Sequence, residues 1–237
     1  MNVLRVRCAD DPGLKARLSS HPCVELDPNP SSAALEFDQG HWHRTLEVGA
    51  QTGLRGLVEL MDNNPLVCAD SFSVPDPGAT LALIAFGPLV RAGLIVERPS
   101  LVASFDLDAD LIDNYLADAA WELGVSSHFE DQPIGSVVAL NAFALIETPQ
   151  NMDDVDALYE EAFGRSFYVR RMEEGDWDID LVEGKAHAAY RLRVTQGDPH
   201  SLLTIQVMAD REGKIGAGQI VHAMNVMAGF EESLGVA

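Results

Sequence analysis

The sequence has little that would serve a disulfide, a metal or a nucleic acid. It holds only three cysteines in 237 residues, widely spaced and without a CxxC pair, so neither a disulfide framework nor a zinc site is predicted. His41 and His43 form an HxH pair, but no third ligand is identifiable, and we predict no metal site. Because 16 Lys and Arg stand against 37 Asp and Glu, the net charge of −21 argues against nucleic acid.

Long apolar runs are also missing. None reaches the length of a membrane span, and the opening MNVLRVRCADD has acids where a signal peptide has an apolar core. The acidity argues against an anionic membrane surface and is typical of a solvated protein surface. We therefore expect a cytoplasmic protein without a membrane partner. What is present is 47% hydrophobic residues, enough to build one large domain or two small ones.

The C-terminal run, residues 213–235, carries the strongest pattern. Its apolar residues recur at helical spacing and fill much of the opposite side as well, which predicts a closing helix over residues 216–234 that is covered on more than one face. This run resembles the last helix of N-acetyl-gamma-glutamyl-phosphate reductases. The matching residues are Lys214, Gly218, Gln219, Met224, Asn225, Met227, Gly229, Phe230 and Glu232.

The resemblance implies a shortened, degenerate member of the superfamily that includes aspartate-semialdehyde dehydrogenase and glyceraldehyde-3-phosphate dehydrogenase-like proteins. We expect an α/β plus α+β fold in two parts. Residues 1–75 would form a trimmed Rossmann-like, degenerate dinucleotide-binding region. Residues 76–237 would form the semialdehyde dehydrogenase-like catalytic and dimerisation domain, with a mainly antiparallel sheet.

The opening of the chain reads as a strand, a helix over residues 13–20 and a second strand. In the family a glycine-rich turn between the first two elements holds the cofactor pyrophosphate at the helix N-terminus. Here the turn is CADDPG, with Gly13 alone at a plausible glycine position. Asp10 and Asp11 would repel phosphate, and one of them is expected to cap the helix. We therefore expect no NADP, NAD or other cofactor.

A second glycine cluster, Gly49, Gly53 and Gly56, is a weaker candidate for a phosphate loop. Its first gap is too long, and no strong strand precedes it. The favoured interpretation is a helix that carries Leu54, Leu57, Val58 and Met61 and leads into a strand at LVCA.

A helix predicted over residues 78–92 resembles the helix that follows the family's catalytic cysteine. One register places Pro77 at the cysteine position and another places Ser73 there, while Cys68 fits neither. Serine without an adjacent base is a poor nucleophile. His128 is the only imidazole in the stretch where the family has its base, and a surface-loop position is favoured for it. Ser73, Cys68 and His128 remain weak catalytic candidates.

From residue 135 the pattern predicts a long strand, a helix, a strand at SFYVRRME and an antiparallel pair, AHAAYRLRV and SLLTIQVMAD. Arg170, Lys185 and Lys214 are ligand candidates, and arginines 170, 171, 191 and 193 could receive a carboxylate. An isologous apolar patch is predicted on the antiparallel pair. Its residues are Tyr190, Leu192, Val194, Leu203, Ile205 and Val207.

These features favour a catalytically inactive homologue, a pseudoenzyme related to enzymes of amino-acid biosynthesis. It would act as a binding or interaction protein with itself as partner, as a homodimer or larger oligomer, and with a small anionic metabolite as a further candidate. Two alternatives stay open. One is an active NADP-dependent semialdehyde dehydrogenase or acyl-phosphate reductase with a rearranged site; the other is a small-metabolite sensor that uses the interdomain cleft.

Overall fold

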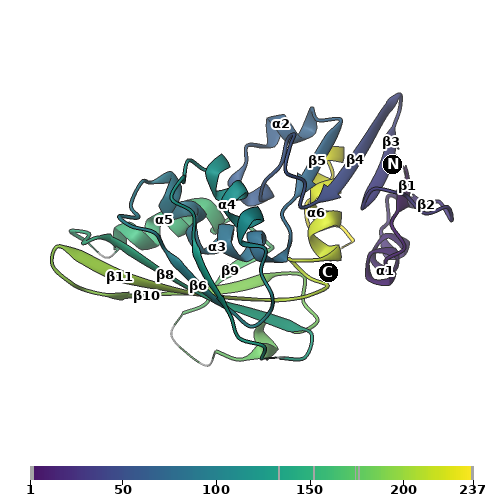
Figure 1. Ribbon diagram of the computed structural model, residues 1–237. Helices are drawn as coiled ribbons and strands as arrows, with labels where there is room; N and C mark the ends of the chain where they lie inside the picture. Colours follow the sequence, from purple (N-terminus) through teal and green to yellow (C-terminus); the bar gives the residue numbers. More distant parts are fainter. Residues whose placement is uncertain (1–2, 133, 152, 174, 176, 236–237) are drawn as a thin grey trace.

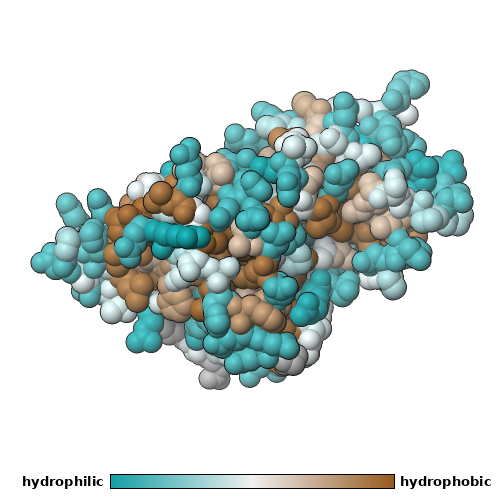
Figure 2. Space-filling model, viewed as in Figure 1, coloured by the Kyte–Doolittle hydropathy of each residue, from teal (hydrophilic) through white to brown (hydrophobic). Residues whose placement is uncertain are grey.

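The computed structural model describes residues 3–132, 134–151, 153–173, 175 and 177–235. It contains two mixed sheets with helices packed on them, which confirms the predicted fold class (Figure 1). No helix in these ranges is long and apolar enough to cross a membrane. Hydrophilic residues are spread over the visible face and not gathered into one patch, with hydrophobic residues showing between them (Figure 2).

The first sheet is built from the N-terminal part of the chain, in the order β2-β1-β3-β4-β5. β1 and β2 pair in parallel on either side of helix α1, β4 and β5 also pair in parallel, and β3 runs antiparallel to both of its neighbours. The predicted strand, helix and strand at the start of the chain are therefore confirmed. The bounds are β1 Leu4–Cys8, α1 Pro12–Ser20, β2 Val24–Leu26, β3 Leu35–Gln39, β4 Trp42–Val48 and β5 Ser71–Val74.

The middle of this region differs from the prediction. A hairpin, β3 and β4, occupies the stretch in which no strong strand was expected, and Gly40 turns it with a φ of 67°. The helix expected after Gly49 is instead a loop followed by the short 3-10 helix η1, Val58–Leu60. The expected strand LVCA lies in and just after helix α2, Asn63–Val67, and the strand comes later, as β5.

Helix α6, Ala217–Ala228, completes the core of the first sheet from the other end of the chain. Every residue of α6 is buried, which confirms that it is covered on more than one face. The helix ends well before the predicted residue 234, because Gly229 adopts a left-handed φ of 72° at the C-cap.

The second sheet has the order β7-β6-β8-β11-β10-β9 and is mainly antiparallel. Helices α3, α4 and α5 lie on one of its faces (Figure 1). The predicted C-terminal strands and their pairing are confirmed. The bounds are α3 Pro77–Arg91, β6 Ser100–Ala103, α4 Ala109–Asp118, β7 Ser126–Phe129, β8 Val137–Glu147, α5 Asp153–Phe163, β9 Val169–Arg171, η2 Ile179–Leu181, β10 Ala188–Thr195 and β11 His200–Asp210.

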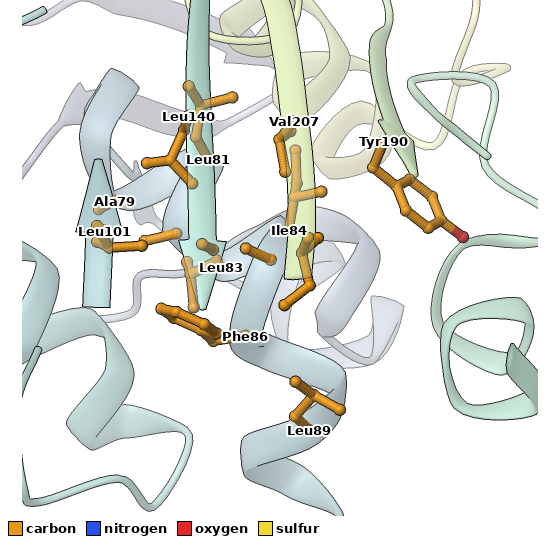
Figure 3. Packing of buried hydrophobic residues seen from close by; sticks show 14 of the residues in the cluster. Ala79, Leu81, Leu83, Ile84, Phe86, Leu89, Leu101, Leu140, Tyr190 and Val207 are labelled. Atoms are coloured by element: carbon orange, nitrogen blue, oxygen red, sulfur yellow. The ribbon is translucent and has the colours of Figure 1, made fainter. Parts of the chain in front are cut away.

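Helix α3 is the centre of the second core. It is buried continuously from Gly78 to Val90, and its side chains pack toward Leu140 of β8 and Val207 of β11 (Figure 3). Each large apolar side chain buried in this way contributes roughly 1.5–3 kcal/mol. The second sheet is therefore held to its helix layer by hydrophobic packing.

The predicted apolar patch faces this helix layer and not the solvent. Tyr190, Leu203, Ile205 and Val207 are buried in the second core, and Leu192 and Val194 pack against it. Their cross-strand pairing is as predicted. Alternation along a strand shows which residues share a face, but it does not show whether helices or a second copy of the chain cover that face. The domain boundary predicted at residue 75 falls between β5 and α3. It stays a prediction, because α6, from the part of the chain after this boundary, packs in the core of the first sheet.

Candidate functional site

The turn from β1 to α1 lies where the resemblance places a cofactor pyrophosphate. Asp11 is the N-cap of α1, as expected, and its carboxylate accepts a hydrogen bond from the Leu14 N–H at 2.8 Å. Pro12 follows, and proline has no N–H to offer a phosphate. A Cβ added to Gly13 would lie 1.9 Å from Oε2 of Glu212, so this glycine makes room for a carboxylate.

Acidic groups therefore surround the start of α1. Glu212 lies in the loop before α6, with its carboxylate next to Gly13. Asp10 pairs with Lys15, and the hydrogen bond from Lys15 lowers the pKa of the Asp10 carboxyl. A phosphate here would meet negative charge and one N–H fewer, in place of the open backbone of a glycine-rich turn. The residues at this position do not fit a dinucleotide.

The start of α3 lies where the resemblance places the catalytic cysteine. Asp76 is the N-cap and accepts a hydrogen bond from the Ala79 N–H at 2.7 Å, while Pro77 opens the helix. Burial raises the pKa of the Asp76 carboxyl. Gln219 of α6 donates to the Pro75 carbonyl at 2.9 Å and so ties the turn to the first core. This helix start holds a capping acid and no thiol.

Ser73, the candidate in the alternative register, is a buried residue of β5. Its Oγ accepts a hydrogen bond from the Ala50 N–H at 2.9 Å and lies 3.4 Å from the Tyr115 hydroxyl. Burial raises the pKa of Tyr115, so this phenol does not act as a base near neutral pH. Ser73 therefore has hydrogen-bond partners but no activating group.

The remaining catalytic candidates lie apart. Cys68 is exposed just after α2, and Cys8 and Cys23 are buried, with burial raising the pKa of the Cys8 thiol. His128 lies on the edge strand β7, where its side chain is 69% exposed and 3.9 Å from Glu130. Within the described part of the chain, no hydrogen bond joins an imidazole to a cysteine or serine side chain.

The loop that contains Gly49, Gly53 and Gly56 bonds to protein along much of its length. The N–H of Gly49 donates to Val74 at 2.9 Å, and the N–H of Gly56 donates to Ser73 at 3.1 Å, so the loop extends the edge of β5. All three glycines have positive φ. They shape a turn against β5, and the N–H groups of Gly49 and Gly56 are already used.

The three ligand candidates do not converge. Lys185 donates to the carbonyl of Asp180 at 2.5 Å and of Leu181 at 3.3 Å, and so caps η2. Arg170 is exposed, with its guanidinium over the ring of Phe167. Lys214 is completely buried, which leaves its ammonium no surface to offer a ligand.

Lys214 belongs to a buried polar cluster that could not be predicted from local sequence patterns. Its Nζ lies 2.7 and 2.8 Å from the two carboxylate oxygens of Glu59. Burial opposes ionisation of Glu59, but Lys214 and His222 beside it hold the pKa of this carboxyl below its usual value. Breaking such a pair from one side costs about 3–5 kcal/mol.

His222 joins this pair to the C-terminal segment. Its Nε2 donates to the Glu232 carboxylate at 3.0 Å, its ring stacks on Tyr168 at 3.9 Å, and burial lowers its pKa. The Tyr168 hydroxyl donates to the Glu232 carbonyl at 2.5 Å. Asn225 of α6 donates to the carbonyls of Glu232 and Leu234 at 3.0 and 2.8 Å. The cluster therefore fastens residues 230–234 to the first core.

The histidine pair lies on the β3–β4 hairpin. His43 of β4 bonds to Asp38 at 2.9 Å, and His41 is exposed in the turn. Among the residues for which the structure gives positions, no group of three His, Cys, Asp or Glu is arranged to hold a metal ion.

Comparison with known proteins gives one consistent answer. No family model matches the chain. N-acetyl-gamma-glutamyl-phosphate reductase of Psychrobacter sp. (strain PRwf-1) is 37% identical over 83 residues, 35% of this chain and 23% of that protein. The Bacillus cereus (strain 03BB102) reductase is 24% identical over 199 residues, 69% of this chain and 56% of that protein. The chain thus spans little over half the length of these curated relatives at most.

The fold comparison agrees. Aspartate semialdehyde dehydrogenase II from Vibrio cholerae superposes with a TM-score of 0.56 at 13% identity, over 73% of this chain and 68% of that one. That likeness concerns the fold, whereas the curated matches concern the sequence. The chain is similar in sequence to N-acetyl-gamma-glutamyl-phosphate reductases and in fold to aspartate semialdehyde dehydrogenase.

Proposed function

We propose that this protein does not reduce acyl phosphates or semialdehydes and that it acts as a binding protein that assembles with itself. The observation that carries the proposal is the start of α3, where Asp76 and Pro77 stand in place of a thiol. A thioester cannot form on proline, and Ser73 lacks a base. The acids around the start of α1 support the absence of a nicotinamide cofactor.

The direct test is an assay of the phosphate-dependent oxidation of N-acetylglutamate semialdehyde, in which the formation of NADPH is measured. We expect no turnover above background, with the Bacillus cereus reductase at the same concentration as the positive control. Calorimetry with NADP should give no Kd tighter than roughly 100 μM, an affinity that corresponds to about −5.5 kcal/mol. Turnover that disappears in Ser73→Ala or Cys68→Ala would refute the proposal.

Self-assembly is proposed through the outer face of the second sheet, which replaces the face expected from the sequence. The cross-strand pair Leu145 and Leu202 lies on it, together with Phe143, and Leu202 is 41% exposed. Light scattering should give about twice the 25.7 kDa chain mass. Leu202→Glu should shift the protein toward the monomer, while Leu123→Glu, at a residue 60% exposed in the loop after α4, should not. A wild-type monomer at about 10 μM contradicts this part.

A further inference from the structure

Residues 230–235 form a strap that folds back along α6. Asn225 of α6 donates through its side chain to the strap carbonyls of Glu232 and Leu234, at 3.0 and 2.8 Å. The N–H of Phe230 donates to the Asn225 backbone carbonyl at 2.8 Å, at the point where the chain leaves the helix. Asn225 therefore holds the strap through both its side chain and its backbone.

His21, between α1 and β2, lies beneath this strap. Gly235 packs so closely on its ring that a Cβ added to Gly235 would lie 2.2 Å from His21 Cδ2. The Phe230 ring lies 6.0 Å from the imidazole, centroid to centroid. Both strap residues are partly exposed, whereas His21 is only 3% exposed. The strap therefore separates the imidazole from water.

The hydrogen bonds of His21 require a neutral ring. The Cys23 N–H donates to Nδ1 at 3.1 Å, so this nitrogen is the acceptor and carries no proton. Nε2 then carries the proton and donates to the Asn225 side-chain oxygen at 3.0 Å. That bond fixes the Asn225 amide with its NH2 group toward the strap carbonyls. A second proton would make Nδ1 a donor that faces the Cys23 N–H, and the two donors would repel each other.

A charged His21 ring would also lack a counter-charge. The charged and titratable side chains on the elements around it are Arg17 of α1, Cys23 and Glu25 at β2, His222 of α6, and Glu231 and Glu232 of the strap. Glu232 is bound by His222 at 3.0 Å, and within the described part of the chain no carboxylate forms an ion pair with His21. Burial lowers the pKa of His21 accordingly.

We propose that the strap is released in mildly acidic solution and that His21 is the group whose protonation releases it. Opening lets water and a proton reach the imidazole, and the closed strap excludes both. The closed state is therefore favoured above the ordinary imidazole pKa of 6.5 and loses its advantage as pH falls below that value. Release uncovers the end of α6, a surface that the protein then presents only in acid. The proposal is independent of the missing reductase chemistry and of the self-assembly face, which lies on the other sheet.

The test is amide hydrogen exchange of the full chain at about pH 7.5 and about pH 5.5, with each rate divided by the intrinsic rate at the same pH. Strap amides should lose at least about tenfold of their protection at the lower pH, because an imidazole that titrates normally in the open state favours that state by this factor. Amides of β8 and β11 should change by less than about twofold. Equal strap protection at both pH values overturns the proposal. An equal loss in β8 also overturns it, because the whole protein would then be opening.

Neutral substitutions of His21 identify the sensor. His21→Asn keeps an acceptor for the Cys23 N–H, and His21→Gln keeps a donor for Asn225, so the two variants disturb different contacts of the ring. In each variant the loss of strap protection between the two pH values should be about tenfold smaller than in wild type. His222→Gln removes the other histidine beside the strap and should keep the contribution of His21.

His187→Gln is the matched control. His187 is also buried, and burial lowers its pKa to about 4, but it bonds to the Leu181 backbone. This variant should lose strap protection in acid as wild type does. A loss of wild-type size in both His21 variants overturns the proposal, as does a strap that no longer responds to pH in the His187 control. Melting curves at the higher pH establish that each variant is folded.

Discussion

Two helices in this protein begin with the same three residues. Asp11, Pro12 and Gly13 start α1, and Asp76, Pro77 and Gly78 start α3. In both, the aspartate caps the helix through the backbone N–H three residues on, and the proline occupies the first helical position. The resemblance places the cofactor phosphates at the first start and the nucleophile at the second. A strong local cap thus stands at each position where the chemistry is expected.

The surroundings of the two starts differ. At α1 the aspartate and proline are exposed and the glycine faces the flexible end of Glu212. At α3 the glycine is buried and faces Leu107, so water has little access. Identical local sequence therefore gives the same helix start but different energetics, because tertiary contacts decide how much stability is lost when the cap is removed.

The largest effect is expected from removal of the caps. Asp76→Ala should lower the free energy of unfolding by about 2 kcal/mol, and Asp11→Ala by about 0.5 kcal/mol, because the freed N–H at α1 can bond to water. Urea unfolding measures both. Asp76→Asn and Asp11→Asn, which keep the cap, are the controls and should not show the losses of the alanine variants. Equal losses in the two alanine variants would show that burial does not distinguish the two starts.

The next largest difference in stability is expected between alanine substitutions of the two glycines. Gly78→Ala places a Cβ 2.9 Å from Leu107 Cδ2, and overpacking should outweigh the gain in chain entropy, for a net loss of about 1 kcal/mol. Gly13→Ala needs only the Glu212 carboxylate to move and should change the free energy of unfolding by less than about 0.5 kcal/mol. Thermal unfolding of the pair, with Glu212→Ala added to Gly13→Ala, checks the assignment. A larger loss at residue 13 contradicts it.

A smaller, pH-dependent effect is expected at Asp76. Because burial raises its pKa above the usual 3.8, the native state holds this proton more tightly than the unfolded state does. Its contribution is therefore fully present below the unfolded pKa and is lost as pH rises through the folded pKa. The stability of Asp76→Asn relative to wild type should grow as pH rises from about 4 and then level off. Urea unfolding at a series of pH values measures this; a flat difference would count against the burial of the carboxyl.

The smallest effect is expected on cofactor affinity at α1. Neutralising the start with Asp10→Asn, Asp11→Asn and Glu212→Gln should leave the NADP Kd weaker than roughly 100 μM, because Pro12 still lacks an N–H and the glycine-rich turn is still missing. Calorimetry with wild type as the reference decides it. Binding tighter than that would mean that charge alone excludes the phosphates.

Much of the fold could be predicted because local signals and the resemblance agree. The cap of α1, expected at Asp10 or Asp11, and the alternating strands β8, β10 and β11 follow from sequence. The hairpin β3–β4 could not be predicted in this way, because Arg44 is buried at a position where the alternation of a strand predicts an apolar residue. Its guanidinium donates to the Met227 carbonyl of α6, a contact that no local pattern announces.

The site was harder to predict than the fold. Sequence identified the positions that lack chemistry, and the structure adds the capping Asp76 at the start of α3. The Glu59 and Lys214 pair joins residues far apart in sequence and could not be foreseen. Of the four arginines, spacing could not say that Arg171, Arg191 and Arg193 share a groove while Arg170 lies elsewhere.

The return of α6 to the first sheet bears on how the protein is made. Strands β1, β3 and β4 are synthesised well before α6, the helix that covers their apolar face. The second sheet differs, because the helices that cover it, α3, α4 and α5, are made before or between its own strands. During translation the apolar face of the first sheet therefore stays exposed until α6 has been made. The contact between them is long-range, which slows folding and favours chaperone binding in the meantime.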